Sequence, residues 1–196
     1  MHPDDAPIPD LTWLDSAGST QDELLARLDR EGHRHGAAVA TADQRAGRGR
    51  HSRVWSAAPG AALALSVYLR PESGGVPVSP AHLSWLSLVA SATVAERLAA
   101  RGVPTHVKWP NDVQIGGKKI AGILSALDMP RVIVGIGINV AMRPEDLPVE
   151  TATALNLEGI DVDFDDFTVD IAENQLLLAS TIRLLHMANL SATVRA

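Results

Sequence analysis

The chain has 196 residues, of which 46% are hydrophobic and 20% charged, and its formal net charge is -6 at pH 7. This length suits one well-buried domain, and the negative net charge argues against bulk affinity for nucleic acid. The sequence contains no cysteine, which excludes disulfides, thiolate catalysis and cysteine-based zinc sites. No apolar run is long enough to span a bilayer, and the N-terminus lacks a signal sequence, so we expect a cytoplasmic protein.

The hydrophobic pattern predicts strands and helices along the chain, after a flexible lead-in over residues 1–10. In the first half, we expect a strand over residues 11–14, a helix over 20–31, strands over 36–42 and 61–70, and a loop over 71–78. In the second half, we expect a helix over 79–101, strands over 105–109, 113–115, 119–127 and 132–140, and helices over 152–157 and 164–187. Strands in mixed order with helices between them predict an α+β fold with a mixed β-sheet backed by α-helices.

Capping and turn residues mark the ends of several of these elements. Ser19 or Thr20 is expected to cap the first helix through its hydroxyl, and Gly102 ends the long helix. Gly116 and Gly117 predict a two-residue hairpin turn, because both positions tolerate a positive φ.

Lysine is confined to one stretch, residues 108–124, with the sequence KWPNDVQIGGKKIAGIL. The chain has 17 lysines and arginines, and only Lys108, Lys118 and Lys119 are lysines. An ammonium is a compact charge on a flexible stem, whereas a guanidinium is a planar fork, so the two are not interchangeable. The cluster indicates a functional site, and the alternative is a charged hairpin tip. Lys118 and Lys119 are expected to face opposite sides of their strand.

The segment GRGRHSR, residues 47–53, places Arg48, Arg50 and Arg53 in a loop with two glycines. Glycine lets backbone N–H groups approach an anion, and arginine donates two hydrogen bonds to phosphate or carboxylate. The segment therefore predicts an anion-binding loop, with a solvated basic loop as the alternative. It matches neither a Walker loop nor a dinucleotide fingerprint.

Two further motifs could line a site. Glycines in the strand segment GIGIN, residues 135–139, indicate close approach of a ligand or of another backbone, although packing under a helix would also explain them. Asn139 could read a purine or ribose edge. The WPND segment could also line the site, with Pro110 fixing the corner. Alternatively, Asn111 and Asp112 could only accept hydrogen bonds from the backbone amides of the turn. The histidines and serines lack the spacings of zinc or serine hydrolases.

Taken together, GRGRHSRVW, KWPNDV, KKIAGIL and GIGINV occur in an order and spacing that resemble the catalytic domain of biotin protein ligases. The resemblance implies a domain over residues 11–187, with a tail over 188–196. It implies the fold shared with class II aminoacyl-tRNA synthetases, a seven-stranded mixed sheet backed by helices. It also implies a two-step reaction in which biotin and ATP form biotinyl-5′-adenylate and pyrophosphate, after which biotin passes to one lysine of a biotin carboxyl carrier protein.

The resemblance also implies roles for individual residues. The catalytic residues would be Lys119, Arg48 and Arg50. Biotin would be bound by Ser19, Thr20, Gln44, Gly47, Arg48, Lys119, Gly122 and Gly135. ATP would be bound by Arg50, Arg53, Trp55, Asn111, Lys119 and Asn139. Mg²⁺ is the implied cofactor, and Asp112 matches the position of a carboxylate that would lie near this ion.

The sequence departs from the family pattern at Gln21, where asparagine is usual, and at Ala126, where an acid is common. We expect no DNA-binding winged helix, no C-terminal SH3-like domain, no membrane partner, and a monomer or weak homodimer. A lipoate or octanoyl ligase of the same fold is one alternative. A truncated biotin- or adenylate-binding protein impaired in transfer is another. GRGRxxRxW and KWPND favour biotin over lipoate.

Overall fold

The computed structural model describes residues 10–32, 36–69, 72–73, 76–77, 85–128 and 131–161. The helix expected over 164–187, the tail over 188–196, and all but the last residue of the lead-in over 1–10 lie outside the described residues. None of the described helices is both long enough and apolar enough to cross a membrane.

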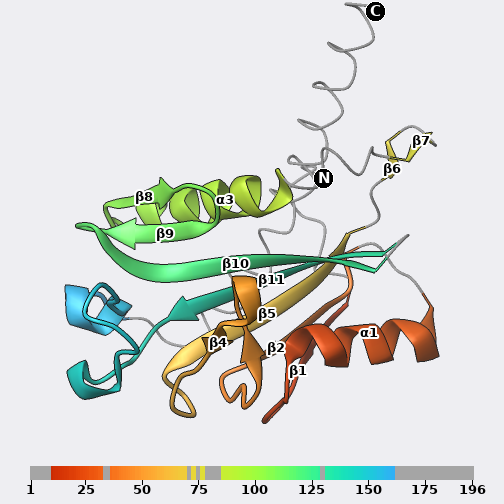
Figure 1. Ribbon diagram of the computed structural model, residues 1–196, viewed down its shortest axis with the longest axis horizontal. Helices are drawn as coiled ribbons and strands as arrows, with labels where there is room; N and C mark the ends of the chain where they lie inside the picture. The colour runs from red at the N-terminus through yellow and green to blue at the C-terminus, as the bar shows by residue number, and fades with distance from the viewer. Residues whose placement is uncertain are drawn as a thin grey trace, which may run out of the picture.

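A seven-stranded mixed sheet forms the centre of the described structure (Figure 1). In sheet order its strands are β1 (Leu11–Trp13), β2 (Ala38–Thr41), β5 (Ala62–Leu69), β11 (Arg131–Asn139), β10 (Lys118–Asp128), β9 (Asp112–Ile115) and β8 (Thr105–Lys108). Strands β1 and β2 pair in parallel, and the other neighbours in this sheet pair antiparallel. The predicted α+β class and the seven-stranded mixed sheet are therefore confirmed.

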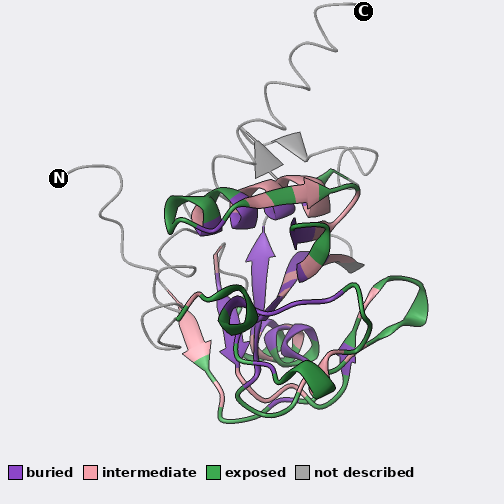
Figure 2. Ribbon diagram, turned by 90° about the vertical axis from the view of Figure 1, so that its left-hand side faces the viewer, coloured by how far each residue is buried: buried purple, intermediate pink, exposed green. Residues whose placement is uncertain are grey.

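Two helices cover opposite faces of the sheet (Figure 1). Helix α1 (Thr20–Glu31) buries Leu24 and Leu28 in a cluster with Ile133 of β11. Helix α3 (Leu86–Ala100) packs on the other face, in a cluster that includes the neighbouring Val134. Successive side chains of a strand point to opposite faces of the sheet. Ile133 therefore marks the face covered by α1, and Val134 marks the face covered by α3. Figure 2 shows buried residues filling the layer between the two helices.

Small residues line the α1 face of the sheet where the three central strands run past the start of α1. The register places Ser66 of β5 opposite Gly135 of β11, and Ala64 opposite Gly137. Gly137 is in turn opposite Gly122 of β10. With so little side-chain volume, the backbone here can be approached closely by other parts of the molecule.

Several predicted elements differ from the structure in detail. The GRGRHSRVW segment, predicted as a loop, forms a hairpin of β3 (Gly47–Arg48) and β4 (Val54–Trp55) around a 3₁₀ turn, Arg50–Ser52. The loop predicted over 71–78 contains a short pair, β6 (Glu72–Ser73) and β7 (Val76–Pro77). The helix predicted over 79–101 is described from Leu86 to Ala100, and residues 79–84 lie outside the described part. Short 3₁₀ turns occupy Pro144–Asp146 and Leu155–Glu158, the second replacing the helix predicted over 152–157.

Candidate active site

A β-bulge in β10 turns Lys119 toward the α1 face of the sheet. Lys119 pairs with Gln114 of β9, whereas Ala121 pairs with the adjacent Val113, so the register shifts by one residue at Ile120. Ile120 and Ala121 are both fully buried in the α3-side core. A bulge adds one residue to a strand and thereby redirects the side chains beyond it. As a result, Lys119 and Gly122 share one face, although regular alternation would separate them.

Lys119 lies between a carboxylate and an aromatic ring. Its Nζ is 2.6 Å from Oδ1 of Asp112, which pairs with Gly122 across β9 and β10. The same Nζ is 5.5 Å from the centroid of the Trp55 ring, within the range of a cation–π contact. About a third of the Lys119 side chain is exposed, so the ammonium can exchange the Asp112 carboxylate for a ligand anion.

The Trp55 ring lies directly on the glycines of β10 and β11. A Cβ atom at Gly137 would lie 2.6 Å from Trp55 Cε2, and one at Gly122 would lie 3.2 Å from Trp55 Cζ3. Real Cβ contacts are longer than the first of these distances, so the ring requires glycine at position 137. The indole, Lys119 and the glycine backbone thus form one layered arrangement.

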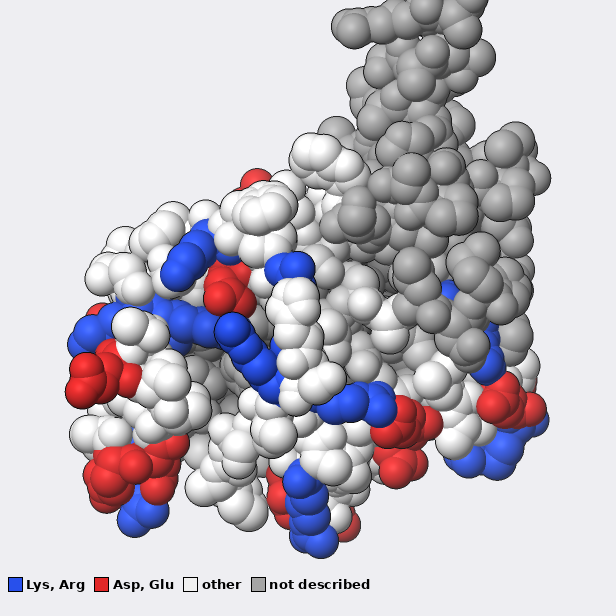
Figure 3. Space-filling model, in the orientation of Figure 1, with Lys and Arg blue, Asp and Glu red and all other residues white. Residues whose placement is uncertain are grey.

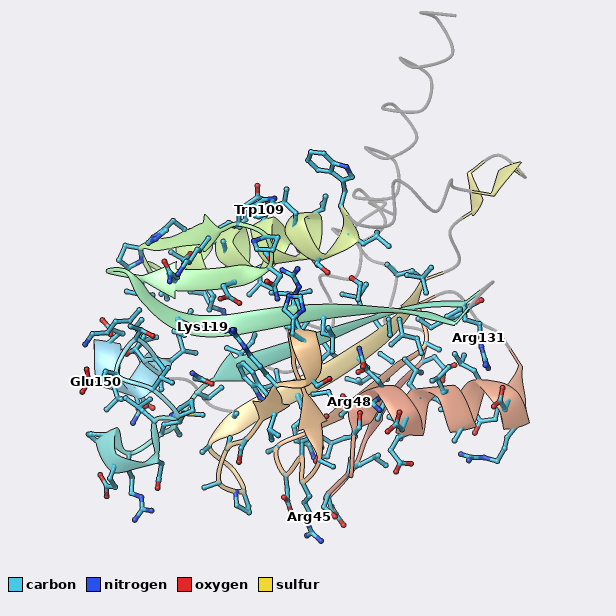
Figure 4. The ribbon with its side chains drawn as sticks, viewed as in Figure 1. Arg45, Arg48, Trp109, Lys119, Arg131 and Glu150 are labelled. Carbon is cyan, nitrogen blue, oxygen red and sulfur yellow. The ribbon has the colours of Figure 1, made fainter. Side chains whose placement is uncertain are left out.

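The β3–β4 hairpin carries the arginines over this face. Arg48 donates from Nη2 to Oδ1 of Asp22 at 2.5 Å and to the Ser19 hydroxyl at 3.3 Å. Arg50 donates from Nη1 to Oδ1 of Asn111 at 3.3 Å, which joins the hairpin to the WPND corner. In the view of Figure 4, Lys119 and Arg48 lie on the two sides of the hairpin. In the view of Figure 3, basic side chains form a band across the middle of the molecule, with acidic side chains beside them.

The tip of the hairpin adopts a conformation that few residues favour. His51 and Ser52 have φ angles of 55° and 60°, in the left-handed region where a Cβ atom is strained. Arg50 and Arg53 flank them, and Arg53 is exposed.

The N-terminus of α1 reaches the site without the predicted side-chain cap. Ser19 is the N-cap residue, but its hydroxyl makes no capping hydrogen bond; it accepts from Arg48 instead. Gln44 takes over the capping role, because its Oε1 accepts from the Thr20 N–H at 2.9 Å and from the Thr20 hydroxyl at 3.1 Å. Expecting Ser19 or Thr20 to cap the helix was therefore wrong, because a side chain distant in sequence satisfies the exposed amide.

The departure at Gln21 is accommodated by a glycine. Gln21 is buried and donates from Nε2 to the Leu124 carbonyl at 2.9 Å. A Cβ atom at Gly135 would lie 2.8 Å from that same Nε2. Gly135 thus makes room for the longer amide of Gln21. Ala126 pairs with Ile133 at a partly buried position, and nothing in the structure explains its choice.

Asn139 anchors the segment of Thr151 and Thr153, whose backbone forms hydrogen bonds with Lys119. It is 3% exposed and donates from Nδ2 to the Thr153 carbonyl at 2.8 Å. The Lys119 N–H donates to the Thr151 carbonyl at 2.7 Å, and the Lys119 carbonyl accepts from the Thr153 N–H at 2.8 Å. Asn139 therefore supports the backbone of the lysine from the neighbouring strand.

The structure brings most of the predicted site residues to the α1 face, around the hairpin and the start of α1. Lys108 and Lys118 are exposed, whereas the Lys119 ammonium pairs with Asp112 on this face, so Lys119 is the candidate lysine of the site. Sequence reasoning missed Ser66, Thr151 and Thr153. Ser66 carries no local signal within an apolar strand, and the two threonines act through backbone groups that any residue possesses.

The fold and site define an α+β domain whose lysine-bearing sheet and arginine-bearing hairpin suit an anionic ligand. The chain belongs to the biotin/lipoate A/B protein ligase family, whose model matches residues 13–142. The predicted membership of this fold family is confirmed.

Curated relatives and a solved structure agree with this assignment. The chain is 40% identical over 144 residues to a biotin–[acetyl-CoA-carboxylase] ligase of Mycobacterium tuberculosis, covering 71% of this chain and 53% of that protein. It is 38% identical over 146 residues to the bifunctional ligase/repressor BirA of Bacillus subtilis, covering 71% and 43%. The biotin protein ligase from Aquifex aeolicus in complex with biotin and ATP superposes with a TM-score of 0.69 at 34% identity, covering 86% of this chain and 70% of that one. The chain spans about half the length of the curated relatives it matches.

Proposed function

We propose that this protein is an ATP-dependent biotin protein ligase. The observation that carries the proposal is the placement of Lys119 by the β10 bulge, beside Trp55 and on the glycine-lined face below the arginine hairpin. Relatives named as biotin ligases, at 36–40% identity, support the same activity. The solved complex with biotin and ATP supports these two substrates.

In the first step, a biotin carboxylate oxygen attacks the α-phosphorus of ATP, and the bond to the departing pyrophosphate breaks. Both reactants are anions, so the enzyme must neutralise charge and align them. Lys119 would contact the carboxylate and the α-phosphate after leaving Asp112. Arg48 and Arg50 would close over the adenylate, and Arg53 would lie near the departing phosphates. Trp55 would stack against adenine.

Ser19, Thr20, Gln44 and Gly47 would form the part of the site that binds the ureido ring. They meet at the start of α1 and the base of the hairpin, where the Gln44 amide lies over Gly47. Gly122 would provide close backbone approach, whereas the predicted role of Gly135 in binding biotin is taken over by Gln21, whose amide occupies the space above that glycine. Asn111 and Asn139 would lie on the nucleotide side.

Asp112 is the candidate residue for holding Mg²⁺. The described residues contain no group of three or more acidic, histidine or cysteine side chains that could hold a metal alone. Magnesium in nucleotide enzymes often uses one or two carboxylates and completes its shell with phosphate oxygens and water. A single carboxylate beside the phosphate site fits that pattern. When bound, the ion would neutralise phosphate charge.

In the second step, the amine of an acceptor lysine attacks the acyl carbon, and the bond to the AMP oxygen breaks. We propose that the acceptor belongs to a biotin carboxyl carrier protein, as the names of the ligase relatives suggest. A cytoplasmic location and a monomer or weak homodimer that does not bind DNA stay predictions.

The proposal is tested by ATP–pyrophosphate exchange with biotin, followed by a separate assay of biotin transfer to a carrier domain. Exchange that depends on biotin is the expected result. Exchange with lipoate or octanoate, and none with biotin, would overturn the proposal. Exchange without transfer would assign the first step alone to this chain.

Replacing Arg48 with glycine is expected to release the adenylate at least about tenfold faster, because charge-assisted hydrogen bonds to the ligand would be lost. The release rate of preformed biotinyl-5′-adenylate, measured by stopped flow, checks this. Arg45→Gly is the matched control, because Arg45 is exposed on the adjoining segment and bonds Asp43 at 2.8 Å. An equal release rate for Arg48→Gly and the parent would contradict the closing role of Arg48.

A further inference from the structure

A buried series of hydrogen bonds connects β5 to the start of α1 and to Gln44. The Ser66 hydroxyl lies 2.8 Å from the Thr20 hydroxyl, and both residues are nearly inaccessible, at 0% and 3% exposure. The Thr20 hydroxyl lies 3.1 Å from Gln44 Oε1, and the Thr20 backbone nitrogen lies 2.9 Å from the same oxygen. The three side chains come from segments far apart in the sequence, and they meet on the α1 face.

The backbone amide of Thr20 determines the direction of every bond in this series. A backbone N–H can only donate, so the Gln44 atom that faces it must be the carbonyl oxygen. The Thr20 hydroxyl also bonds that oxygen, so it gives its one proton to Gln44. Ser66 must then donate to Thr20. The series therefore runs from Ser66 through Thr20 to Gln44.

This direction leaves the amide nitrogen of Gln44 on the opposite side, toward the hairpin. Nε2 lies over Gly47, where a Cβ atom would approach it to 2.6 Å. A glutamine amide whose oxygen is held by two donors presents its N–H groups as donors. The ligand group that matches is a hydrogen-bond acceptor, and in a biotin ring the strong acceptor is the ureido carbonyl oxygen.

We propose that Ser66 is a positioning residue: by donating to Thr20 it directs the Thr20 hydroxyl proton toward Gln44, which reinforces the Gln44 orientation set by the Thr20 backbone N–H and thereby favours biotin over acids whose tail lacks an acceptor. The inference rests on the proposed function, since it takes biotin as the substrate. Ser66 touches none of the reacting groups and acts through Thr20. Its contribution is therefore expected in substrate binding and not in the chemical step.

Ser66→Ala is expected to raise KM for biotin roughly fivefold, the factor equivalent to one neutral hydrogen bond, while kcat stays within about twofold. The inhibition constant of octanoate against biotin should not change, because its tail offers no acceptor. Biotin-dependent ATP–pyrophosphate exchange measures both constants.

Ser91→Ala is a matched control. Ser91 is also 0% exposed and its hydroxyl donates one hydrogen bond, of 2.7 Å, to the Ser87 carbonyl. It lies in α3, on the other face of the sheet. Both substitutions delete one buried hydroxyl, so a general loss of stability should affect both variants, whereas only Ser66→Ala should raise KM for biotin. Equal KM values in the two variants would overturn the inference.

The side-chain amide resonances of Gln44, recorded by NMR on the unliganded protein, provide a second readout. Ser66→Ala should shift them, and Ser91→Ala should leave them in place. Unchanged Gln44 resonances in Ser66→Ala would overturn the positioning role whatever the substrate is. Failure of the parent to catalyse biotin-dependent exchange would instead refute the proposed function, and the resonances would still decide whether Ser66 orients Gln44.

Discussion

Replacing Lys119 with alanine is expected to slow biotin-dependent ATP–pyrophosphate exchange by at least about a hundredfold while the fold persists. The ammonium is the cation that the β10 bulge directs toward the glycine-lined face, where it pairs with Asp112 at 2.6 Å. Its loss would leave two approaching anions without their central counter-charge. Exchange rates and the thermal unfolding midpoint, measured on the same preparations, separate a catalytic loss from a folding defect.

Lys118→Ala is the matched control for this prediction, because Lys118 is the adjacent residue of the same strand and is exposed. It should leave exchange close to the parent rate. Lys119→Arg should restore little activity, because a planar guanidinium cannot follow the reacting oxygens as a compact ammonium does. Equal losses in Lys118→Ala and Lys119→Ala would mean that general surface charge, and not a placed ammonium, supports the reaction.

Replacing Gly137 with alanine is expected to raise KM for ATP by roughly tenfold and to destabilise the protein by about 1–3 kcal/mol. The added methyl group would lie 2.6 Å from Trp55 Cε2, so the indole must leave its place on the sheet. The 5.5 Å contact between that ring and Lys119 would be lost with it. Exchange kinetics at varied ATP concentration and denaturant unfolding measure the two effects.

A double-mutant cycle with Trp55→Ala tests whether the effect acts through the ring. Once the indole is absent, Gly137→Ala should change KM for ATP little, because no atom remains for the methyl group to displace. Gly18→Ala is a steric control, since a Cβ atom there would meet nothing within 4 Å. Additive effects of Gly137→Ala and Trp55→Ala would contradict the proposed contact.

Local patterns were sufficient to predict most of the sheet and α1. Alternation bounded by Pro59-Gly60 and Pro71 predicted β5, and the Gly116-Gly117 pair, with φ angles of 54° and 85°, forms the expected turn. The Ser19 cap could not be predicted correctly, because the acceptor that replaces it comes from Gln44, distant in the sequence. The β3–β4 hairpin was missed because two-residue strands contain too few residues to show a period.

The placement of Lys119 illustrates why motifs located the site better than periodicity did. In KKIAGIL, strict alternation puts Lys119 on the same face as Ala121 and opposite Gly122. The register shift against β9 reverses this, and it depends on pairing between two strands, which one strand's sequence does not reveal.

Because lysine is confined to residues 108–119, reagents that react with side-chain amines label one region of this protein selectively. Lys108 and Lys118 are exposed, and Lys119 is held by Asp112 with about a third of its side chain accessible. Arginine is not acylated by amine-selective reagents under mild conditions, so such a reagent labels only these three positions and the terminal amine. Mass spectrometry of the labelled protein then reports the accessibility of Lys119 directly, with its two neighbours as internal standards.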